Sequence, residues 1–252
     1  MTMTRPGEPQ LPSLGGQARG TANGPGTPAP DVVVAIDGPV GSGKSTVARA
    51  VAERTGLRYL DTGSTYRALT LALLRRGTPV DDPAAVAESA ATVPIALELD
   101  ARPAATSRVL LDGEPVRPEL LRSNEVNAAV SAVSAVPAVR RRLVELQRSA
   151  MAGGGVVAEG RDVGTVVWPD AEVKVFLTAA PNERARRRGG LDGTGESADQ
   201  VARRDDLDSS RAVAPTRASE DALVIDSTAR PVDDVVSEIV ALVGAARASR
   251  ER

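Results

Sequence analysis

The stretch Gly38-Pro-Val-Gly-Ser-Gly-Lys-Ser45 fits the pattern G-x-x-x-x-G-K-[ST], which is typical of loops that cradle phosphate groups. The apolar run at 32–36 before it has the length of a buried strand, and residues 47–53 after it mix apolar and charged side chains as a helix start does. This order brings successive backbone N–H groups and a helix N-terminus to one anion. The stretch therefore predicts a nucleotide or polyphosphate site.

The residues of this loop have distinct expected tasks. The three glycines allow positive φ angles and a close approach of the backbone to phosphate. Lys44 is expected to reach the β- and γ-phosphates, and the Ser45 hydroxyl to ligate Mg²⁺. A chance glycine turn is the alternative, but lysine is rare in this chain, which has only Lys44 and Lys174.

The composition excludes several classes of chemistry. The 252 residues include no cysteine and no histidine, which removes disulfides, thiol nucleophiles, Ser-His catalysis and the usual zinc sites. Arginine, lysine, carboxylates, hydroxyls, backbone amides and a metal held by oxygen remain, and this inventory suits phosphoryl transfer. A net charge of −2 and an aromatic content of 2 % argue against a nucleic-acid partner.

The two ends of the chain differ in character. Residues 1–30 are rich in Pro, Gly and Thr and lack periodicity, so they predict a disordered leader before one folded domain over 31–252. No apolar run has the length of a membrane span, and the N-terminus lacks the layout of a signal peptide. We expect no membrane partner, a cytoplasmic location and a monomer.

The order of the apolar segments predicts an α/β fold. Strands are expected near 32, 57, 156, 173 and 222, and helices follow them, which is the pattern of a P-loop NTPase-type parallel five-stranded sheet with helices on both faces. Residues 93–118 instead alternate around an Asp112-Gly113 turn, so they predict a small antiparallel β insert. Further helices are expected at 44–55, 84–91, 119–134, 137–151 and 232–246, and one begins at Tyr66 with Ser64 or Thr65 as its N-cap.

Polar residues follow two of the predicted strands. Asp61, Thr62 and Arg67 come after the strand near 57, and the segment 159–162, Glu-Gly-Arg-Asp, comes after the strand near 156. Ligands of open α/β sheets gather at the carboxyl ends of the strands, so both groups are candidates for a binding site. In the alternative interpretation, Asp61 and Thr62 only cap a helix and Arg67 forms a surface ion pair.

A third group of charges surrounds a glycine-rich segment. Residues 181–188 open a helix rich in arginine, residues 189–199 are rich in Gly, Asp and Ser, and charge resumes at 203–211. Arg204, Asp208 and Arg211 share one face if this last piece is helical. The pattern predicts an Arg-rich lid that closes over a triphosphate. A solvated helix with internal ion pairs is the alternative.

Five segments together resemble the bacterial cytidylate kinases, a family of nucleoside monophosphate kinases. They are Ile36-Asp-Gly-Pro-Val-Gly-Ser-Gly-Lys-Ser-Thr46, Leu60-Asp-Thr-Gly-Ser-Thr-Tyr-Arg67, Glu159-Gly-Arg-Asp-Val-Gly-Thr-Val-Val-Trp-Pro-Asp170, Arg204-Asp-Asp-Leu-Asp-Ser-Ser-Arg-Ala-Val-Ala-Pro215 and Val224-Ile-Asp-Ser-Thr228. The resemblance covers about 31–248. Many families share the first segment, whereas the third and fourth are far more specific.

The resemblance implies an activity and a set of site residues. The activity is transfer of the γ-phosphoryl group of ATP to CMP or dCMP with Mg²⁺, in pyrimidine nucleotide metabolism, with an insert at about 93–126 that binds nucleotide and a lid at about 183–212. The implied ATP-binding residues are Gly38, Pro39, Val40, Gly41, Ser42, Gly43, Lys44, Ser45 and Thr46. The implied CMP-binding residues are Thr62, Arg67, Ser131, Arg140, Arg161, Asp162, Arg204, Asp208 and Arg211. Lys44, Arg161 and Arg211 are the implied catalytic residues.

Within the CMP-binding set, the resemblance implies three tasks. Thr62 to Arg67 hold the acceptor phosphate, with Arg161 and Arg211 as further phosphate contacts. Arg204 and Asp208 bind the ribose, and Ser131, Arg140 and Asp162 read cytosine. A carboxylate can accept from the exocyclic amino group of cytosine and an arginine can donate to N3 or O2, whereas uracil reverses two of these groups. The acceptor phosphate has a second pKa of about 6, so it needs no general base at neutral pH.

Three other functions are weighed against this one. A kinase for UMP, AMP, a deoxynucleoside or shikimate is opposed only by the implied cytosine readers. A GTPase would need an N-K-x-D segment, and neither lysine follows an asparagine. A nucleic-acid binder is disfavoured by the mixed charge and the pI near 5.5. The family often has Ser where this chain has Thr62, and which of Arg184, Arg187 and Arg188 contacts ATP stays open.

Overall fold

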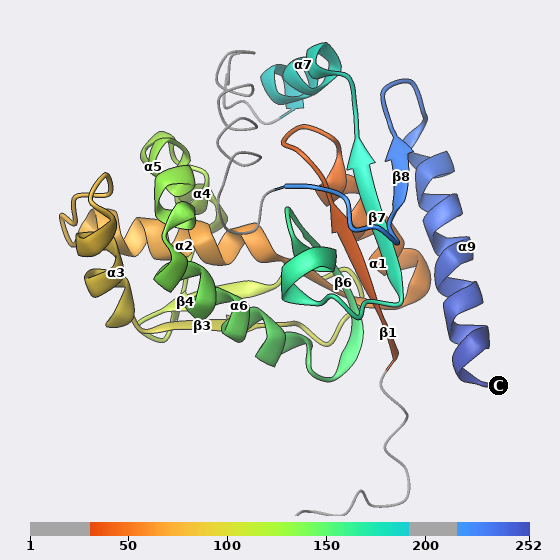
Figure 1. Ribbon diagram of the computed structural model, residues 1–252, viewed down its shortest axis with the longest axis horizontal. Coiled ribbons are helices and arrows are strands. Elements are labelled where there is room, and N and C mark those ends of the chain that lie inside the picture. The colour runs from red at the N-terminus through yellow and green to blue at the C-terminus, as the bar shows by residue number, and fades with distance from the viewer. Residues whose placement is uncertain (1–30, 192–215) are drawn as a thin grey trace, which may run out of the picture.

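A computed structural model describes residues 31–191 and 216–252 of the chain. The predicted leader at 1–30 and most of the predicted lid lie outside these ranges. Two sheets and the helices around them make up the described part (Figure 1).

The larger sheet has five parallel strands in the order β2-β6-β1-β7-β8. They are β1 (Asp31–Asp37), β2 (Arg58–Asp61), β6 (Gly154–Gly160), β7 (Val173–Thr178) and β8 (Leu223–Asp226). All five strands predicted from the apolar runs are present, and the predicted fold class is confirmed. Because β1 is the middle strand, the loop that follows it begins at the centre of the edge formed by the carboxyl ends of the strands.

Side chains of β1 alternate between two cores, one on each face of the sheet. Val32, Val34 and Ile36 pack against α1 (Lys44–Thr55) and α9 (Val232–Arg250). The other face of the strand packs towards α6 (Pro137–Met151) and η1 (Val163–Val167), a single π-helical turn. Buried on both faces, the strand reads as a continuous apolar run in the sequence.

The smaller sheet is antiparallel, in the order β3-β4-β5, as predicted for the insert. Its strands are β3 (Ile95–Glu98), β4 (Arg108–Leu111) and β5 (Glu114–Pro115). Asp112 and Gly113 turn between β4 and β5 with φ angles of 52° and 82°, which is the tight hairpin turn that an Asp-Gly pair favours.

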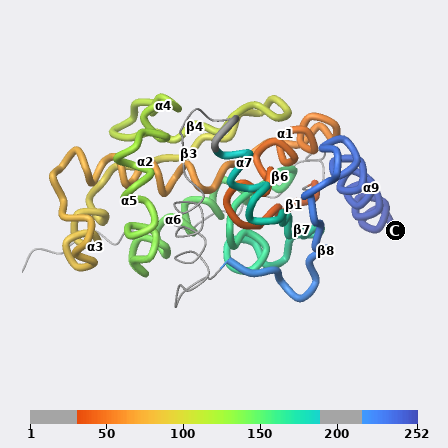
Figure 2. Tube along the Cα trace, turned by 90° about the horizontal axis from the view of Figure 1, so that it is seen from above, coloured from red at the N-terminus to blue at the C-terminus, as the bar shows by residue number. Residues whose placement is uncertain are grey.

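A third core lies under this insert and the helices near it. It joins the insert to α2 (Thr62–Arg75), α3 (Pro83–Ala91), α5 (Asn124–Ala135) and α6. Figure 2 shows this group of helices and the insert at the opposite end of the molecule from α9.

Several helix boundaries differ from the predictions. Helix α2 begins at Thr62 rather than at Tyr66, and its N-cap is Asp61, which accepts a hydrogen bond from the backbone N–H of Ser64 at 3.2 Å. The helix predicted at 119–134 is two helices, α4 (Pro118–Leu121) and α5, because Ser123 caps the second of them. The last helix extends to Arg250, and η1 was not predicted.

Candidate functional site

The phosphate-binding loop connects β1 to α1 at the centre of the sheet edge. Gly38, Gly41 and Gly43 have φ angles of 148°, 76° and 91°, in the range that favours glycine. At Gly38 a Cβ atom would lie 2.0 Å from the carbonyl oxygen of Leu177, and at Gly41 it would lie 2.7 Å from that of Arg184. These two glycines therefore let the loop pack against β7 and α7 (Pro181–Leu191), besides leaving room for a phosphate.

Lys44 begins α1 and points back into the loop. It is buried, and its Nζ donates to the carbonyl oxygen of Pro39 at 2.6 Å. Ser45 follows in the same first turn and forms a hydrogen bond with the Glu159 carboxylate. An ammonium group, a hydroxyl and a carboxylate thus meet where the first strand ends and the first helix begins.

Glu159 stands near the end of β6, beside the loop. Burial and the nearby Asp61 carboxylate raise its pKa, whereas Lys44 and hydrogen bonds from Ser45 and Tyr59 oppose that rise. In the sequence, Glu159 stands out only as a carboxylate that follows the apolar run at 156–158, and this position does not reveal its role.

The first turn of α2 lies next to this carboxylate. The Thr62 hydroxyl donates to the carbonyl oxygen of Glu159 at 2.7 Å, and the Asp61 side chain caps the helix. The capping interpretation of Asp61 is therefore correct, although Asp61 also borders the cleft described below. Arg67 donates to the carbonyl oxygen of Leu121 at 3.0 Å and to Oδ1 of Asn127 at 2.6 Å.

Arg140 and Asp162 form a buried ion pair between α6 and the turn after β6. Only 5 % of the Arg140 side chain and 7 % of the Asp162 side chain are exposed. Arg140 also donates to the carbonyl oxygen of Ser134 at 3.3 Å, and its guanidinium lies 5.4 Å from the ring centre of Tyr66. Such fixed, desolvated groups recognise hydrogen-bonding partners selectively, because a mismatched partner leaves them unpaired.

One cleft of about 960 Å³ joins all these groups. From the predicted ATP-binding set it is lined by Val40, Gly41, Gly43, Lys44, Ser45 and Thr46, and from the predicted CMP-binding set by Thr62, Arg67, Ser131, Arg140, Arg161 and Asp162. The two strand-end segments, 61–67 and 159–162, are about a hundred residues apart in the sequence. Residues of both therefore line the same cleft as the phosphate-binding loop.

The chain also matches known proteins. The family model described as cytidylate kinase matches residues 34–245. The chain belongs to the cytidylate kinase family. It is 48 % identical to the cytidylate kinase of Pelotomaculum thermopropionicum over 85 % of this chain and 96 % of that protein, and 50 % identical to that of Mycobacterium leprae over 84 % and 96 %. A solved gluconokinase from Sinorhizobium meliloti, 15 % identical, matches 88 % of this chain and 97 % of its own with a TM-score of 0.43.

Cytidylate kinases phosphorylate CMP and dCMP using ATP, so the chain falls among the ATP-dependent phosphotransferases. Not every residue implied by the cytidylate kinase resemblance borders the cleft. Three of the implied ATP-binding residues do not line the cleft, namely Gly38, Pro39 and Ser42. They contribute to the conformation of the loop instead. Arg204, Asp208 and Arg211 lie outside the described residues.

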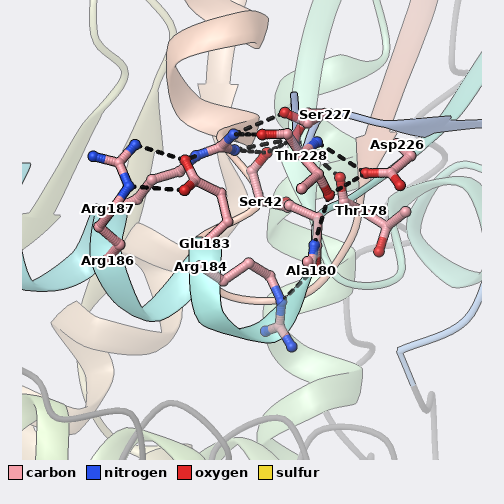
Figure 3. A network of polar contacts seen from close by, with 11 residues as sticks. Ser42, Thr178, Ala180, Glu183, Arg184, Arg186, Arg187, Asp226, Ser227 and Thr228 are labelled. Carbon is pink, nitrogen blue, oxygen red and sulfur yellow. Dashed lines mark hydrogen bonds and ion pairs between the residues drawn. The ribbon is translucent and has the colours of Figure 1, made fainter. Parts of the chain in front are cut away.

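Helix α7 attaches the start of the predicted lid to the loop (Figure 3). Arg187 donates to the carbonyl oxygens of Ser42 at 3.4 Å and Ser227 at 2.8 Å, and Glu183 accepts from its Nε at 2.8 Å. Arg184 donates to the carbonyl oxygen of Val40 at 3.1 Å. Of the three arginines left open by the sequence, Arg187 and Arg188 border the cleft, whereas Arg184 supports the loop.

The insert brings further arginines to the cleft, and the sequence did not predict them as site residues. They are Arg102, Arg108, Arg117 and Arg122, and together with Arg67, Arg140, Arg161, Arg187 and Arg188 they make a strongly cationic wall. Two of them are partly neutralised, since Arg102 pairs with Asp100 at 2.7 Å and Arg108 with Glu98 at 3.0 Å. Nothing in their local sequence separates them from ordinary surface arginines.

Asp37, the last residue of β1, is a buried carboxylate behind the loop. Its two oxygens accept hydrogen bonds from the backbone N–H groups of Val163 and Gly164. Burial nevertheless raises its pKa from the ordinary value of 3.8 to about 6, because these bonds do not fully replace water.

This raised pKa predicts a pH-dependent loss of stability. Between pH 4 and pH 6 the unfolded chain has released the Asp37 proton while the folded protein keeps it, so rising pH favours unfolding. The full effect is about 3 kcal/mol. Urea unfolding of Asp37→Asn and the wild type should therefore show the variant gaining that amount relative to the wild type from pH 4 to pH 7. Parallel stability curves would contradict it.

Over 31–191 and 216–252, none of the helices combines the length and the apolar character needed to cross a membrane.

Proposed function

We propose that this protein transfers the γ-phosphoryl group of ATP to CMP and dCMP, giving ADP and CDP or dCDP. The observation that carries the proposal is that one cleft is lined both by the phosphate-binding loop and by the buried Arg140–Asp162 pair. A donor triphosphate at the loop and an acceptor base at the pair would direct their phosphates towards each other.

On the donor side, we assign ATP to the loop and to the N-terminus of α1. Lys44 would leave the carbonyl oxygen of Pro39 for the phosphate oxygens, because a phosphate is a stronger acceptor for an ammonium group. Its positive charge would then offset the charge that develops on the transferring group.

The oxygen ligands beside the loop fit Mg²⁺. Ser45 offers a hydroxyl, and Glu159 and Asp61 offer carboxylates that border the same cleft. Magnesium prefers such oxygen donors and takes the rest of its ligands from substrate phosphates and water. No group of three or more acidic residues that could hold a metal occurs in the described part of the chain. When bound, Mg²⁺ would neutralise phosphate charge.

On the acceptor side, we assign the phosphate of CMP to Arg67 and Arg161, near Thr62. The nucleophile is a phosphate oxygen that is already ionised at neutral pH, so the arginines only have to hold it in line against the repulsion between two anions. The resemblance adds Arg211 to this task and gives the ribose to Arg204 and Asp208. We retain these roles, the lid and the nucleotide-binding insert as proposals.

Cytosine is assigned to Ser131, Arg140 and Asp162. The ion pair fixes the two side chains in one geometry before substrate binds, and both are almost fully desolvated. Asp162 would accept from the amino group of the base and Arg140 would donate to N3 or O2. Uracil would set an oxygen against the carboxylate, so a loss of affinity follows from the unpaired groups.

The reaction and its metal requirement can be tested together. Full-length protein mixed with ATP, CMP and Mg²⁺ should yield ADP and CDP in equal amounts, measured by ion-exchange chromatography. Excess EDTA should reduce turnover to background, and added Mg²⁺ should restore it, because the phosphate charges are otherwise left unneutralised. CDP formation that persists in EDTA would contradict the proposed role of the metal. The cytoplasmic location and the monomeric state remain predictions.

A further inference from the structure

Asp37 belongs to the motif at the loop, but the proposed reaction gives it no task. It ends β1, comes directly before Gly38, and is 5 % exposed. Its Oδ1 accepts from the N–H of Val163 at 2.8 Å and its Oδ2 from the N–H of Gly164 at 2.7 Å. One carboxylate therefore bridges two consecutive amides at the start of η1.

The turn held in this way carries the acceptor-side residues Arg161 and Asp162. It is packed closely from a second direction, since a Cβ at Gly160 would lie 2.5 Å from Oγ1 of Thr62. The far end of η1 is held by Arg148, which donates to the carbonyl oxygens of Val166 at 2.7 Å and Val167 at 2.9 Å. The backbone between these anchors has little room to move.

We propose that Asp37 is a positioning residue that sets the acceptor selectivity of the enzyme by holding Arg161 and Asp162 in register with the phosphate-binding loop. The inference rests on the proposed function. Asp37 touches neither nucleotide in this account, so it acts through the turn that it holds.

The chemistry of the two contacts requires a carboxylate. An ionised carboxylate accepts at both oxygens, so it satisfies both amides at once. An asparagine would turn an NH₂ group towards one of these N–H groups, which would push the turn away or rotate it. A buried ionised group lowers the stability of a protein. Its presence is therefore expected where it has a functional task, such as orienting other residues.

Kinetics of Asp37→Asn on a panel of monophosphates test the inference. We expect kcat/KM for CMP to fall about 10- to 100-fold, because small displacements of positioning groups have effects of this size. The KM for ATP should stay near the wild-type value, and the ratio of kcat/KM for CMP over that for UMP should fall. The urea midpoint at pH 7.5 should stay close to wild type, because losing a buried charge offsets the lost hydrogen bond.

Asp31→Asn is the matched control. Asp31 opens the same strand at its other end and pairs with Arg247 at 2.9 Å, far from the turn. Its selectivity should equal that of the wild type. If CMP and ATP use fall equally in Asp37→Asn, or if the CMP-to-UMP ratio is unchanged, the inference is wrong.

A second variant covers the case in which Asp37→Asn does not fold. Gly160→Ala keeps the N–H groups that Asp37 binds but places a Cβ 2.5 Å from Oγ1 of Thr62 and 2.8 Å from Cγ2 of Val163, so the turn has to shift. It should also show a loss that is confined to the acceptor. If the wild type prefers another monophosphate, the proposed function fails, yet loss or retention of that preference in the variants still decides the role of Asp37.

Discussion

Replacing Lys44 with methionine should lower kcat by about 10²- to 10³-fold, with a much smaller change in the KM for CMP. Methionine keeps most of the buried stem and removes only the charged end, so packing at the start of α1 is retained. The lost charge serves the transition state, where the transferring phosphoryl group needs it most.

The only other lysine supplies the control. Lys174 on β7 pairs with Asp221 at 2.6 Å rather than with the loop, so Lys174→Met should keep kcat near the wild-type value. Steady-state rates at saturating ATP and CMP, with urea unfolding for both variants, separate catalysis from stability. Full turnover by Lys44→Met would remove Lys44 from the mechanism.

The second large effect is expected at Asp162. Asp162→Asn should lower kcat/KM for CMP by about 10²-fold or more while the KM for ATP stays near wild type, because the amide places a donor where the cytosine amino group needs an acceptor. The same change weakens the ion pair with Arg140, so some loss of stability is expected as well.

Initial rates with CMP and UMP, at fixed ATP, measure this effect. Asp170→Asn is a suitable control because Asp170 is exposed and lies shortly after the same turn. The CMP-to-UMP ratio should fall only in the Asp162 variant. Equal losses for CMP and ATP would make Asp162 a structural residue instead.

Most of the fold could be predicted because its signals are local. The strands β1, β6 and β7 are short, largely apolar runs with mostly buried side chains, and the loop at Gly38 marks the central strand. The edge strand β8 instead exposes Leu223 and Val224. The antiparallel insert could also be predicted, from the alternating pattern of its residues and from its Asp-Gly turn. In these segments the residue pattern alone decides which faces are buried.

The helix boundaries and the detail of the site depend on contacts that the sequence does not display. Helix α2 begins with polar residues, and Thr62 can be buried there because the carbonyl oxygen of Glu159, 97 residues away, accepts from its hydroxyl. The π-helical turn likewise depends on Asp37, which is 126 residues from Val163. Neither element has a local period that would reveal it.

The same distinction applies to the candidate site. The loop and the strand-end carboxylates could be identified from motif and position, and the cytosine-reading set only from the resemblance to cytidylate kinases. The four insert arginines that border the cleft carry no local signal, because only the tertiary fold brings β4 and its neighbours to the loop.

Whether the cleft accepts CMP can be measured with a panel of nucleoside monophosphates as acceptors. Coupled ADP-release assays at fixed ATP and Mg²⁺ should give kcat/KM for CMP and dCMP values about 10²-fold or more above those for UMP and AMP, because the Arg140–Asp162 pair leaves the wrong base edge unpaired. If UMP or AMP is turned over faster than CMP, the assignment of the acceptor site is wrong.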